Sequence, residues 1–374
     1  MTRYTIPFTR VHLTGRELDY IREAIERNHL SGDGTFTRRC QAWLEENTGC
    51  AKALLTHSGT AALEMAAILS DVGPGDEVIL PSFTFSSTAN AFVLRGATPV
   101  FVDIEPVRFN IDPDRIAAAI TPRTKAVVPV HYAGAACDME TIGALAREHD
   151  LLVIEDAAQA LLATDGTRPL GSIGQLAALS FHETKNVSAG EAGALLINDR
   201  RFLERAEIVR EKGTNRSRFF RGEVDKYTWV DAGSSYLPSE LVAAFLLAQL
   251  EAAQEITARR VAIWQRYHEA LAPFEGDRLR RPRAGSGNGH IYPVLLRDED
   301  ARQRTIDHLK SRGISAVFHY VPLHSSPAGV KHGRTCWPMD VTDDVSRRLL
   351  RLPLWPDMTD EQLDLVAAAV AESL

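Results

Sequence analysis

Short apolar runs separated by longer stretches of mixed polarity dominate the first 200 residues of the chain. The runs are residues 52–56, 77–81, 99–103, 125–130, 151–156, 176–181 and 193–198. Most of them are continuously apolar rather than alternating, which is typical of strands that helices cover on both faces. The pattern predicts a seven-stranded sheet in a doubly wound α/β domain.

Apolar residues at helical spacing appear in the segments that connect these runs. Residues 60–70 and 139–149 show this spacing, and so does the segment near the start of the chain that carries Leu18, Ile21 and Ile25. Helices that connect successive parallel strands pack on the faces of the sheet. We therefore expect an entry helix and then a sheet with helices on both faces.

The last third of the chain has a different pattern. A long helical region from about residue 239 to residue 271 leads into it. Strand patterns at residues 290–298 and 314–320 flank a helix pattern at residues 301–313. The expected parts of the chain are an N-terminal segment (residues 1–30), a large α/β domain (31–250) and a small C-terminal α+β domain (251–374).

Composition excludes several classes of protein. Of the 374 residues, 45% are hydrophobic and 24% charged, which is the balance of a folded globule, and the net charge of −7 argues against general nucleic-acid binding. No apolar run approaches the roughly 18 residues of a membrane span, and the N-terminus lacks a secretory signal. Four cysteines without a CxxC pair predict reduced thiols and no metal site. We expect a cytoplasmic protein.

Ligands of open α/β sheets bind at the carboxyl ends of the strands, so the residues that follow each run are candidates for chemistry. Ser58, Gly59 and Thr60 follow the first run and begin a helix, where free backbone N–H groups attract anions. Taken alone, Ser58 is more simply an N-cap. Phe85, which follows the second run, either stacks on a flat ligand or belongs to the core.

Two further candidates end buried strands. Asp156 closes the run 151–156, where a carboxylate is costly unless a cation pairs with it, although an N-cap role is also plausible. Gln159 lies three residues on and faces the same side of the turn. Ser180 and Lys185 follow the run 176–181. Desolvation would keep the amine of Lys185 neutral, as a Schiff-base lysine requires, unless Lys185 extends to solvent.

Together these residues suit one ligand, pyridoxal 5′-phosphate (PLP). Its phosphate fits Ser58–Thr60 and Ser180, its ring fits Phe85 and Asp156, and its aldehyde fits Lys185. A carboxylate that keeps the pyridine nitrogen protonated makes the ring an electron sink for a carbanion at an amino acid's α-carbon. Lys185 would then carry the proton between carbon positions as general base and acid.

The motifs that contain these residues also carry a family resemblance. HSGTAALEMA (57–66), PSFTFSSTANAFV (81–93), VPVHYAG (128–134), VIEDAAQA (153–160) and SFHETKN (180–186) resemble those of the DegT/StrS-type sugar aminotransferases. The resemblance runs from about residue 5 to the C-terminus. It implies a fold-type I PLP enzyme (aspartate aminotransferase-like), with a seven-stranded, mostly parallel sheet and a smaller α+β domain. It also implies a homodimer with shared active sites.

A narrower resemblance concerns the substrate. SGDGTFTRRCQAWLE (31–45), REKGTNRSRFFRGEVDKYTW (210–229) and FHYVPLH (318–324) resemble segments of the transaminases that act at the C4 keto group of one dTDP-sugar. The implied reaction converts dTDP-4-keto-6-deoxy-D-glucose and L-glutamate into dTDP-4-amino-4,6-dideoxy-D-galactose and 2-oxoglutarate. Such products enter bacterial surface polysaccharides, the O-antigen among them.

The resemblance also implies roles for single residues. It makes Lys185 the Schiff-base lysine, Asp156 the partner of the pyridine nitrogen, and Gln159 the neighbour of the ring's 3-hydroxyl. It places Phe85 on the ring. The implied phosphate ligands are Gly59, Thr60 and Ser180, beside the N-cap candidate Ser58, and the implied neighbours of the nucleotide sugar are Lys226, His319 and Tyr320.

One segment departs from the family pattern. Many relatives carry G-Y-N-x-R, whose Asn reaches the phosphate of the partner subunit's cofactor. The chain has GSSYL there, with Ser235 in place of that Asn and Leu237 in place of the Arg. A contact of Ser235 with the partner's cofactor therefore stays open.

Other functions were weighed against this one. The chain has no G-x-G-x-x-G between a strand and a helix, no P-loop and no G-x-S-x-G elbow, which argues against a dinucleotide oxidoreductase, a P-loop nucleotidase and a serine hydrolase. Sugar dehydratases of the family lack the Schiff-base lysine, so Lys185 argues against that activity. The alternatives that stay open are a different nucleotide sugar, a C3 keto sugar, and a catalytically silent sensor of nucleotide sugars.

Overall fold

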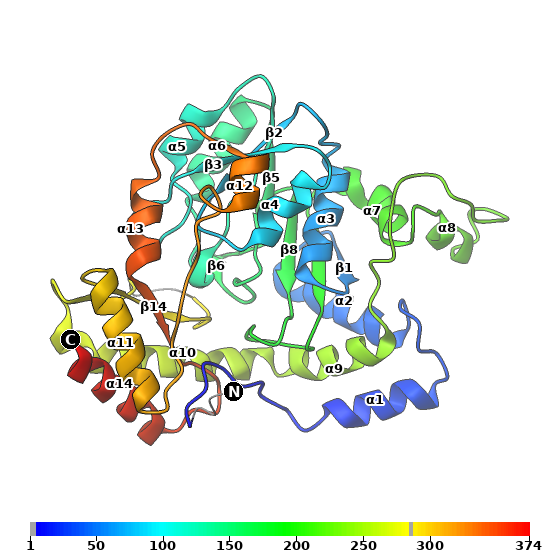
Figure 1. The fold of residues 1–374 in the computed structure, drawn as a ribbon. Helices are drawn as coiled ribbons and strands as arrows, with labels where there is room; N and C mark the ends of the chain where they lie inside the picture. Colours follow the sequence, from blue (N-terminus) through cyan, green and yellow to red (C-terminus); the bar gives the residue numbers. More distant parts are fainter. Residues whose placement is uncertain (1–4, 284–286) are drawn as a thin grey trace.

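All seven apolar runs form strands of one sheet, and an eighth short strand joins it at the edge (Figure 1). In this computed structural model, residues 5–283 and 287–374 are described. Along the sheet, the strands are β1 (Lys52–Thr56), β9 (Gly193–Ile197), β8 (Leu176–Ser180), β5 (Leu152–Asp156), β4 (Thr124–Val127), β2 (Glu77–Pro81), β3 (Thr98–Val102) and β13 (Arg334–Thr335). Strand β9 is antiparallel to both neighbours and the other pairings are parallel, so the sheet is mostly parallel as expected.

Helices cover both faces of this sheet because its strands are apolar on both sides. On one face α3 (Gly59–Leu69), α4 (Ser86–Val93) and α7 (Leu203–Arg210) pack on residues such as Leu54 and Leu80. The opposite face is covered by α1 (Glu17–Glu26), α2 (Thr35–Thr48), α5 (Pro113–Ala119), α6 (Met139–Glu148) and α9 (Glu240–Glu251). The predicted doubly wound arrangement is confirmed, and α3 and α6 match the helices expected at 60–70 and 139–149.

The register of the strands brings their carboxyl ends together at one edge. Gly193 lies opposite Thr56 at the end of β1 and opposite Ser180 at the end of β8. Next to β8, Asp156 at the end of β5 pairs with Ala178. The residues that follow β1, β5 and β8 therefore begin side by side, although more than 100 residues separate β1 from β8 in the sequence.

The helical region expected at 239–271 is two helices. Ser239 caps α9 by accepting a hydrogen bond from the Val242 N–H, as its sequence position suggests. A bend of 59° at Ala252 separates α9 from α10 (Ala253–Ala270). Within the described residues no single helix has both the length and the apolar composition of a membrane span, and α9 and α10 meet that test only as this bent pair.

A second, four-stranded sheet lies in the C-terminal part of the chain. Its strands, all antiparallel, are β10 (Leu279–Arg280), β11 (Tyr292–Leu296), β14 (Leu349–Leu352) and β12 (Val317–Phe318). Strand β12 is shorter than the pattern at 314–320 predicts, because Ile314 bridges to Ile6 instead. This sheet packs together with helices α10, α11 (Glu299–Ser311), α13 (Asp340–Arg348) and α14 (Asp360–Ser373).

The C-terminal part also contacts the large sheet directly. After α12 (Pro327–His332), strand β13 pairs in parallel with β3, so a segment from the end of the chain extends the large sheet. Helix α8 (Arg216–Phe220) projects from the opposite side (Figure 1). A small hairpin of β6 (Thr164–Asp165) and β7 (Arg168–Pro169) completes the elements. The domain boundaries proposed from the sequence stay a prediction.

Candidate active site

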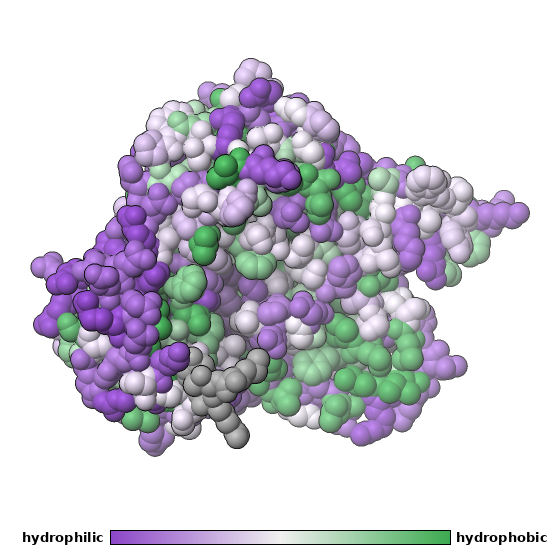
Figure 2. Space-filling model, viewed as in Figure 1, coloured by the Kyte–Doolittle hydropathy of each residue, from purple (hydrophilic) through white to green (hydrophobic). Residues whose placement is uncertain are grey.

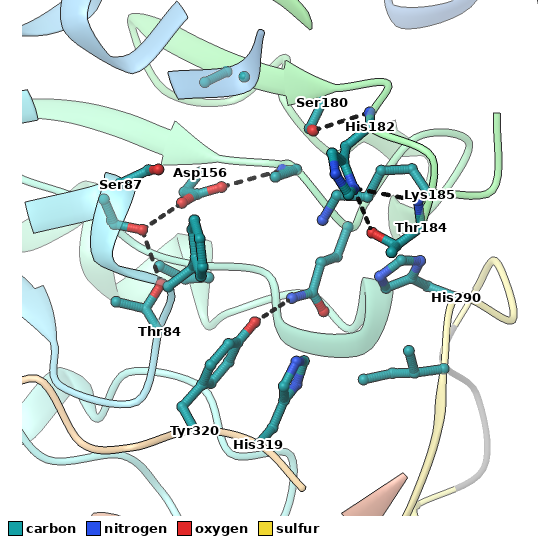
Figure 3. Close-up of a pocket in the computed structure, with 18 of the residues that line it drawn as sticks. Thr84, Ser87, Asp156, Ser180, His182, Thr184, Lys185, His290, His319 and Tyr320 are labelled. Carbon is teal, nitrogen blue, oxygen red and sulfur yellow. Dashed lines mark hydrogen bonds between the residues drawn. The ribbon is translucent and has the colours of Figure 1, made fainter. Parts of the chain in front are cut away.

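A cavity of about 520 Å³ lies at the carboxyl ends of the large sheet, between that sheet and β14 of the smaller one. Residues from both sheets and from the N-terminal segment line it. Figure 3 shows Asp156 and Lys185 entering from different sides, with His319 and Tyr320 along a third. Of the sequence-predicted residues, the cavity brings together Ser58, Gly59, Thr60, Phe85, Asp156, Gln159, Ser180, Lys185, His319 and Tyr320.

The turn at Ser58–Thr60 forms the N-terminus of α3. Ser58 is an N-cap, since its Oγ accepts from the Ala61 N–H at 3.1 Å, and it lines the cavity as well. Glycine is required at two places: a Cβ on Gly59 would lie 2.8 Å from Ser180 Cβ, and a Cβ on Gly193 would lie 2.4 Å from the Ser58 backbone. The turn therefore lies directly on β8 and β9, where the first N–H groups of α3 can bind an anion.

Asp156 is buried at the end of β5. Thr88 of α4 donates its hydroxyl to Oδ2 at 2.7 Å, and the Ala158 N–H donates to Oδ1 at 3.2 Å. The sequence left two roles open for this carboxylate, pairing with a cation or capping a helix, and among the described residues its hydrogen-bond partners are a hydroxyl and a backbone N–H. The carboxylate can therefore take a positively charged group of a ligand.

Lys185 follows β8 on a tight loop, with its backbone N–H donating to the His182 carbonyl at 2.9 Å. Its side chain lines the cavity rather than extending into bulk solvent. Burial lowers the pKa of Lys185 to about 8, with a smaller contribution from Arg351 and against an opposing effect of Asp156. A lysine with that pKa is substantially neutral near pH 8, which makes its amine a nucleophile.

Gln159 connects the two sides of the cavity. Its Oε1 accepts from the Ala133 N–H at 2.7 Å and its Nε2 donates to the Tyr320 hydroxyl at 2.9 Å. The rings of His319 and Tyr320 stack with centroids 3.8 Å apart. Burial, reinforced by Arg351 and Lys185, lowers the pKa of His319 well below its usual range, so the imidazole is neutral. These contacts fix His319 and Tyr320, which follow β12, as a polar wall of the cavity.

Phe85 belongs to the cavity and not to the core. It precedes α4 with 62% of its surface exposed, whereas Phe83, two residues before it, is buried. Thr60 of the anion-binding turn bonds to Ser87 in the first turn of α4, with the two hydroxyl oxygens 2.7 Å apart. An exposed aromatic ring above a polar cavity is available for stacking on a flat ligand.

Two predicted residues lie elsewhere. Lys226 and Ser235 are exposed on the segment between α7 and α9, and neither lines this cavity. Ser235 instead forms a backbone bridge with Glu211. The structure therefore does not bring them to the cavity of their own subunit.

Several cavity residues escaped the sequence analysis. Thr88 is buried within the 81–93 motif, four residues after Thr84, but nothing in the sequence distinguishes a threonine that holds a carboxylate from one that packs. Arg260, His290 and Arg351 come from the C-terminal third of the chain, far from the ends of the seven apolar runs. Among the described residues, no group of three or more His, Cys, Asp or Glu lies together as a metal site.

Comparisons with known proteins agree on the class of protein. The model of the DegT/DnrJ/EryC1/StrS aminotransferase family matches residues 12–371. The chain is 35% identical to a GDP-perosamine synthase of Caulobacter vibrioides, over 97% of this chain and 96% of that one. It is also 35% identical to the spore coat polysaccharide biosynthesis protein SpsC of Bacillus subtilis, over 98% and 96%.

Solved structures show the same fold. A putative sugar aminotransferase of Streptococcus pneumoniae in its PMP form superimposes with a TM-score of 0.91 at 26% identity, covering 99% of this chain and 98% of that one. Streptomyces DesV, given in its title as S. venezuelae DesV in complex with a ketimine intermediate, gives 0.88 at 30% identity, with 98% of each chain covered.

Proposed function

Because the chain belongs to the DegT/DnrJ/EryC1/StrS aminotransferase family and is a PLP-dependent sugar aminotransferase, we propose that it aminates the keto group of a nucleotide-linked deoxysugar. The amine donor in this proposal is L-glutamate. The preferred sugar is dTDP-4-keto-6-deoxy-D-glucose, which would give dTDP-4-amino-4,6-dideoxy-D-galactose and 2-oxoglutarate.

The observation that supports this proposal most strongly is that one cavity holds both a desolvated amine and a carboxylate, with no ion pair between them. Lys185 has an amine that burial makes partly neutral, and Asp156 has a carboxylate that forms no ion pair with the residues that the structure describes. PLP, when bound, supplies an aldehyde for the amine and a pyridine ring that takes up electrons from a substrate's α-carbon. Its protonated ring nitrogen is a partner for Asp156, so the residues present fit the cofactor.

The other cavity residues would each bind a different part of the cofactor. The N–H groups and hydroxyls at Ser58–Thr60, with Ser180, would hold the phosphate at the N-terminus of α3. Phe85 would cover one face of the ring, and Gln159 would lie near its hydroxyl. Lys185, once its amine is free, would move the proton between the donor's α-carbon and the cofactor as general base and acid.

The choice of sugar in this proposal rests on the resemblance of residues 31–45, 210–229 and 318–324. His319 and Tyr320 form the wall on which a hexose would rest, with His319 neutral and able to exchange hydrogen bonds with sugar hydroxyls. The name of the Caulobacter relative points to a GDP-linked sugar for that protein. For this chain we propose the dTDP-sugar and the C4 position.

We also propose that the enzyme is a cytoplasmic homodimer whose subunits complete each other's active sites. Helix α1 exposes Leu18 and Ile25, at 72% and 56%, although the entry-helix pattern suggests buried positions. Figure 2 shows hydrophobic side chains gathered over this region. Lys226 lies on an exposed segment outside its own cavity, as does Trp229, which is 78% exposed. A second copy that covers α1 would let this segment reach the partner's cavity.

The first prediction concerns the absorption spectrum of the holoenzyme. L-glutamate without sugar should bleach the visible band of bound PLP, and dTDP-4-keto-6-deoxy-D-glucose should then restore it.

Lys185→Ala should lower turnover by more than about a hundredfold, because the general base is lost. The control is Lys310→Ala, which removes an exposed lysine of α11 and should leave turnover unchanged.

Each outcome bears on a separate part of the proposal. A band that glutamate does not bleach would contradict the donor and the transamination. If only a GDP-linked sugar restores the band, the aminotransferase activity stands and the proposed dTDP nucleotide is wrong. An active Lys185→Ala enzyme would overturn the role of that lysine.

The second prediction follows from the pKa of Lys185. When PLP is added to the apoenzyme, the rate at which its visible band develops should rise with pH with a midpoint near pH 8, the pKa of the amine, and level off about one pH unit higher. An ordinary lysine, with a pKa near 10.4, would give a rate that still rises at pH 10. The reaction of PLP with a free lysine derivative corrects for the cofactor's own ionisation. A midpoint near 10 would contradict the desolvated amine.

The third prediction tests the shared active site. Lys226→Ala should weaken nucleotide-sugar binding by roughly 10- to 100-fold, as expected for loss of a charged hydrogen bond. Subunits with Lys185→Ala and subunits with Lys226→Ala, mixed and allowed to exchange, should recover about a quarter of wild-type activity, because half the dimers then hold one complete site. The assay uses a sugar concentration too low to saturate Lys226→Ala. A mixture no more active than the mean of its two components would mean that Lys226 acts in its own subunit.

A further inference from the structure

The chain between β12 and α13 leaves the smaller sheet and lies on the large one (Figure 1). We call residues 319–339 the strap, which contains α12 and β13. Strand β13 pairs with β3, and Arg334 within it bonds to the buried Glu77 of β2, with Nη2 2.8 Å from Oε2. Beyond the strap, Asp103 at the end of β3 accepts the Thr342 N–H of α13 at 2.8 Å. A segment of the C-terminal third is therefore fastened to the large sheet.

The anchor of the strap that lies nearest the cavity is made by one serine. Ser82 directly follows β2 and is fully buried. Its carbonyl accepts the Leu323 N–H at 3.1 Å, and its Oγ accepts the His324 N–H at 3.0 Å. The same Oγ lies 2.8 Å from His324 Nδ1. A single residue at the edge of the large sheet thus bonds to two consecutive residues of the strap.

The surroundings of His324 decide how its ring takes part in this anchor. Its side chain is only 14% exposed, and its Nε2 lies 3.5 Å from the Asp343 carboxylate of α13. A carboxylate favours a donor on that nitrogen, so Nε2 carries the proton and Nδ1 accepts from the Ser82 hydroxyl. That hydroxyl is then both donor and acceptor toward His324, an arrangement that an apolar side chain cannot reproduce.

The polar wall of the cavity lies between this anchor and the smaller sheet. His319 directly follows β12, and only residues 321–323 separate Tyr320 from His324. Pro322 lies in that short link and fixes one of its backbone angles, which makes the link stiff. A displacement at the anchor is therefore carried to the wall.

The two halves of the proposed reaction use this wall differently. The donor's amine reacts between Lys185 and Asp156, which lie at the strand ends of the large sheet. The keto sugar must also be held by its hydroxyls, and His319 and Tyr320 are the side chains proposed for that. A small error in the place of the wall should therefore cost the sugar more than the donor.

We propose that His324 is a positioning residue for the keto sugar, acting through its bond with Ser82 on the place of His319 and Tyr320. This inference rests on the proposed function. His324 does not line the cavity, so its effect passes through the strap and not through contact with the sugar.

The test measures the two half-reactions separately on the holoenzyme. L-glutamate is titrated without sugar, and the concentration that half-bleaches the visible band is recorded. dTDP-4-keto-6-deoxy-D-glucose is then titrated against the aminated enzyme, and the concentration that half-restores the band is recorded. The variants are His324→Leu, Ser82→Ala, the two combined, and His324→Asn, whose amide can take the place of Nδ1.

We expect His324→Leu and Ser82→Ala each to raise the half-restoring concentration of the sugar by roughly 10- to 100-fold and to leave the half-bleaching concentration of L-glutamate within about threefold. The double variant should bind the sugar no more weakly than either single variant, because both substitutions remove the same contact. His324→Asn should recover most of the affinity for the sugar.

Two matched controls lie on the same strap. Arg334→Met removes the anchor on Glu77, which is farther from the wall in sequence, and should lower the temperature of unfolding without changing either titration. His332→Leu alters an exposed residue of α12 and should behave as wild type.

Three results would overturn the assignment. Equal losses for donor and sugar in His324→Leu, or loss of PLP binding by that variant, would mean that the anchor supports the whole cavity. A loss of sugar affinity in Arg334→Met as large as in His324→Leu would assign the effect to the strap in general. Wild-type sugar titrations in both His324→Leu and Ser82→Ala would leave His324 without the role. A wild-type band that L-glutamate does not bleach, or that the sugar does not restore, would instead contradict the proposed function.

Discussion

The site depends on a separation: the fold keeps Lys185 and Asp156 from forming an ion pair with each other. Lys185 and Asp156 face the same cavity, and each would be the natural partner of the other. They stay apart because Asp156 is held by the Thr88 hydroxyl and the Ala158 N–H, while Lys185 enters from the loop after β8. Contact between them would raise the pKa of Lys185, whereas burial without contact lowers it to about 8. A neutral amine and an unpaired carboxylate are what a cofactor with an aldehyde and a protonated ring requires.

Close backbone packing keeps this separation in place. The ends of β1, β9 and β8 meet at Thr56, Gly193 and Ser180, and the turn that begins α3 lies on them with no space for a Cβ at Gly193. The anion-binding turn, the strand that ends in Asp156 and the loop that carries Lys185 therefore form one rigid edge. The C-terminal part of the chain closes the cavity from the other side, where Gln159 donates a hydrogen bond to Tyr320, two residues after β12.

The sequence predicted the large sheet well because its strands are buried on both faces and appear as continuous apolar runs. It missed β13, since two residues have no periodicity, and the bend at Ala252, which no proline or glycine marks. The site residues at strand ends could be found because topology brings those ends together. Arg351 could not, because its strand is distant in sequence and only the packing of the two sheets turns it towards the cavity. The exposed positions of Lys226 and Ser235 likewise depend on tertiary structure.

The most direct test of the account is to find the lysine that carries the cofactor. Reducing the holoenzyme with sodium borohydride fixes PLP on the amine it has joined, and mass spectrometry of the digested protein then identifies that residue. The account predicts the label on Lys185, with no labelled peptide from Lys185→Ala. A label on another lysine, or a holoenzyme in which no lysine is labelled, would contradict the claim that the buried amine of Lys185 is the group on which the cavity is built.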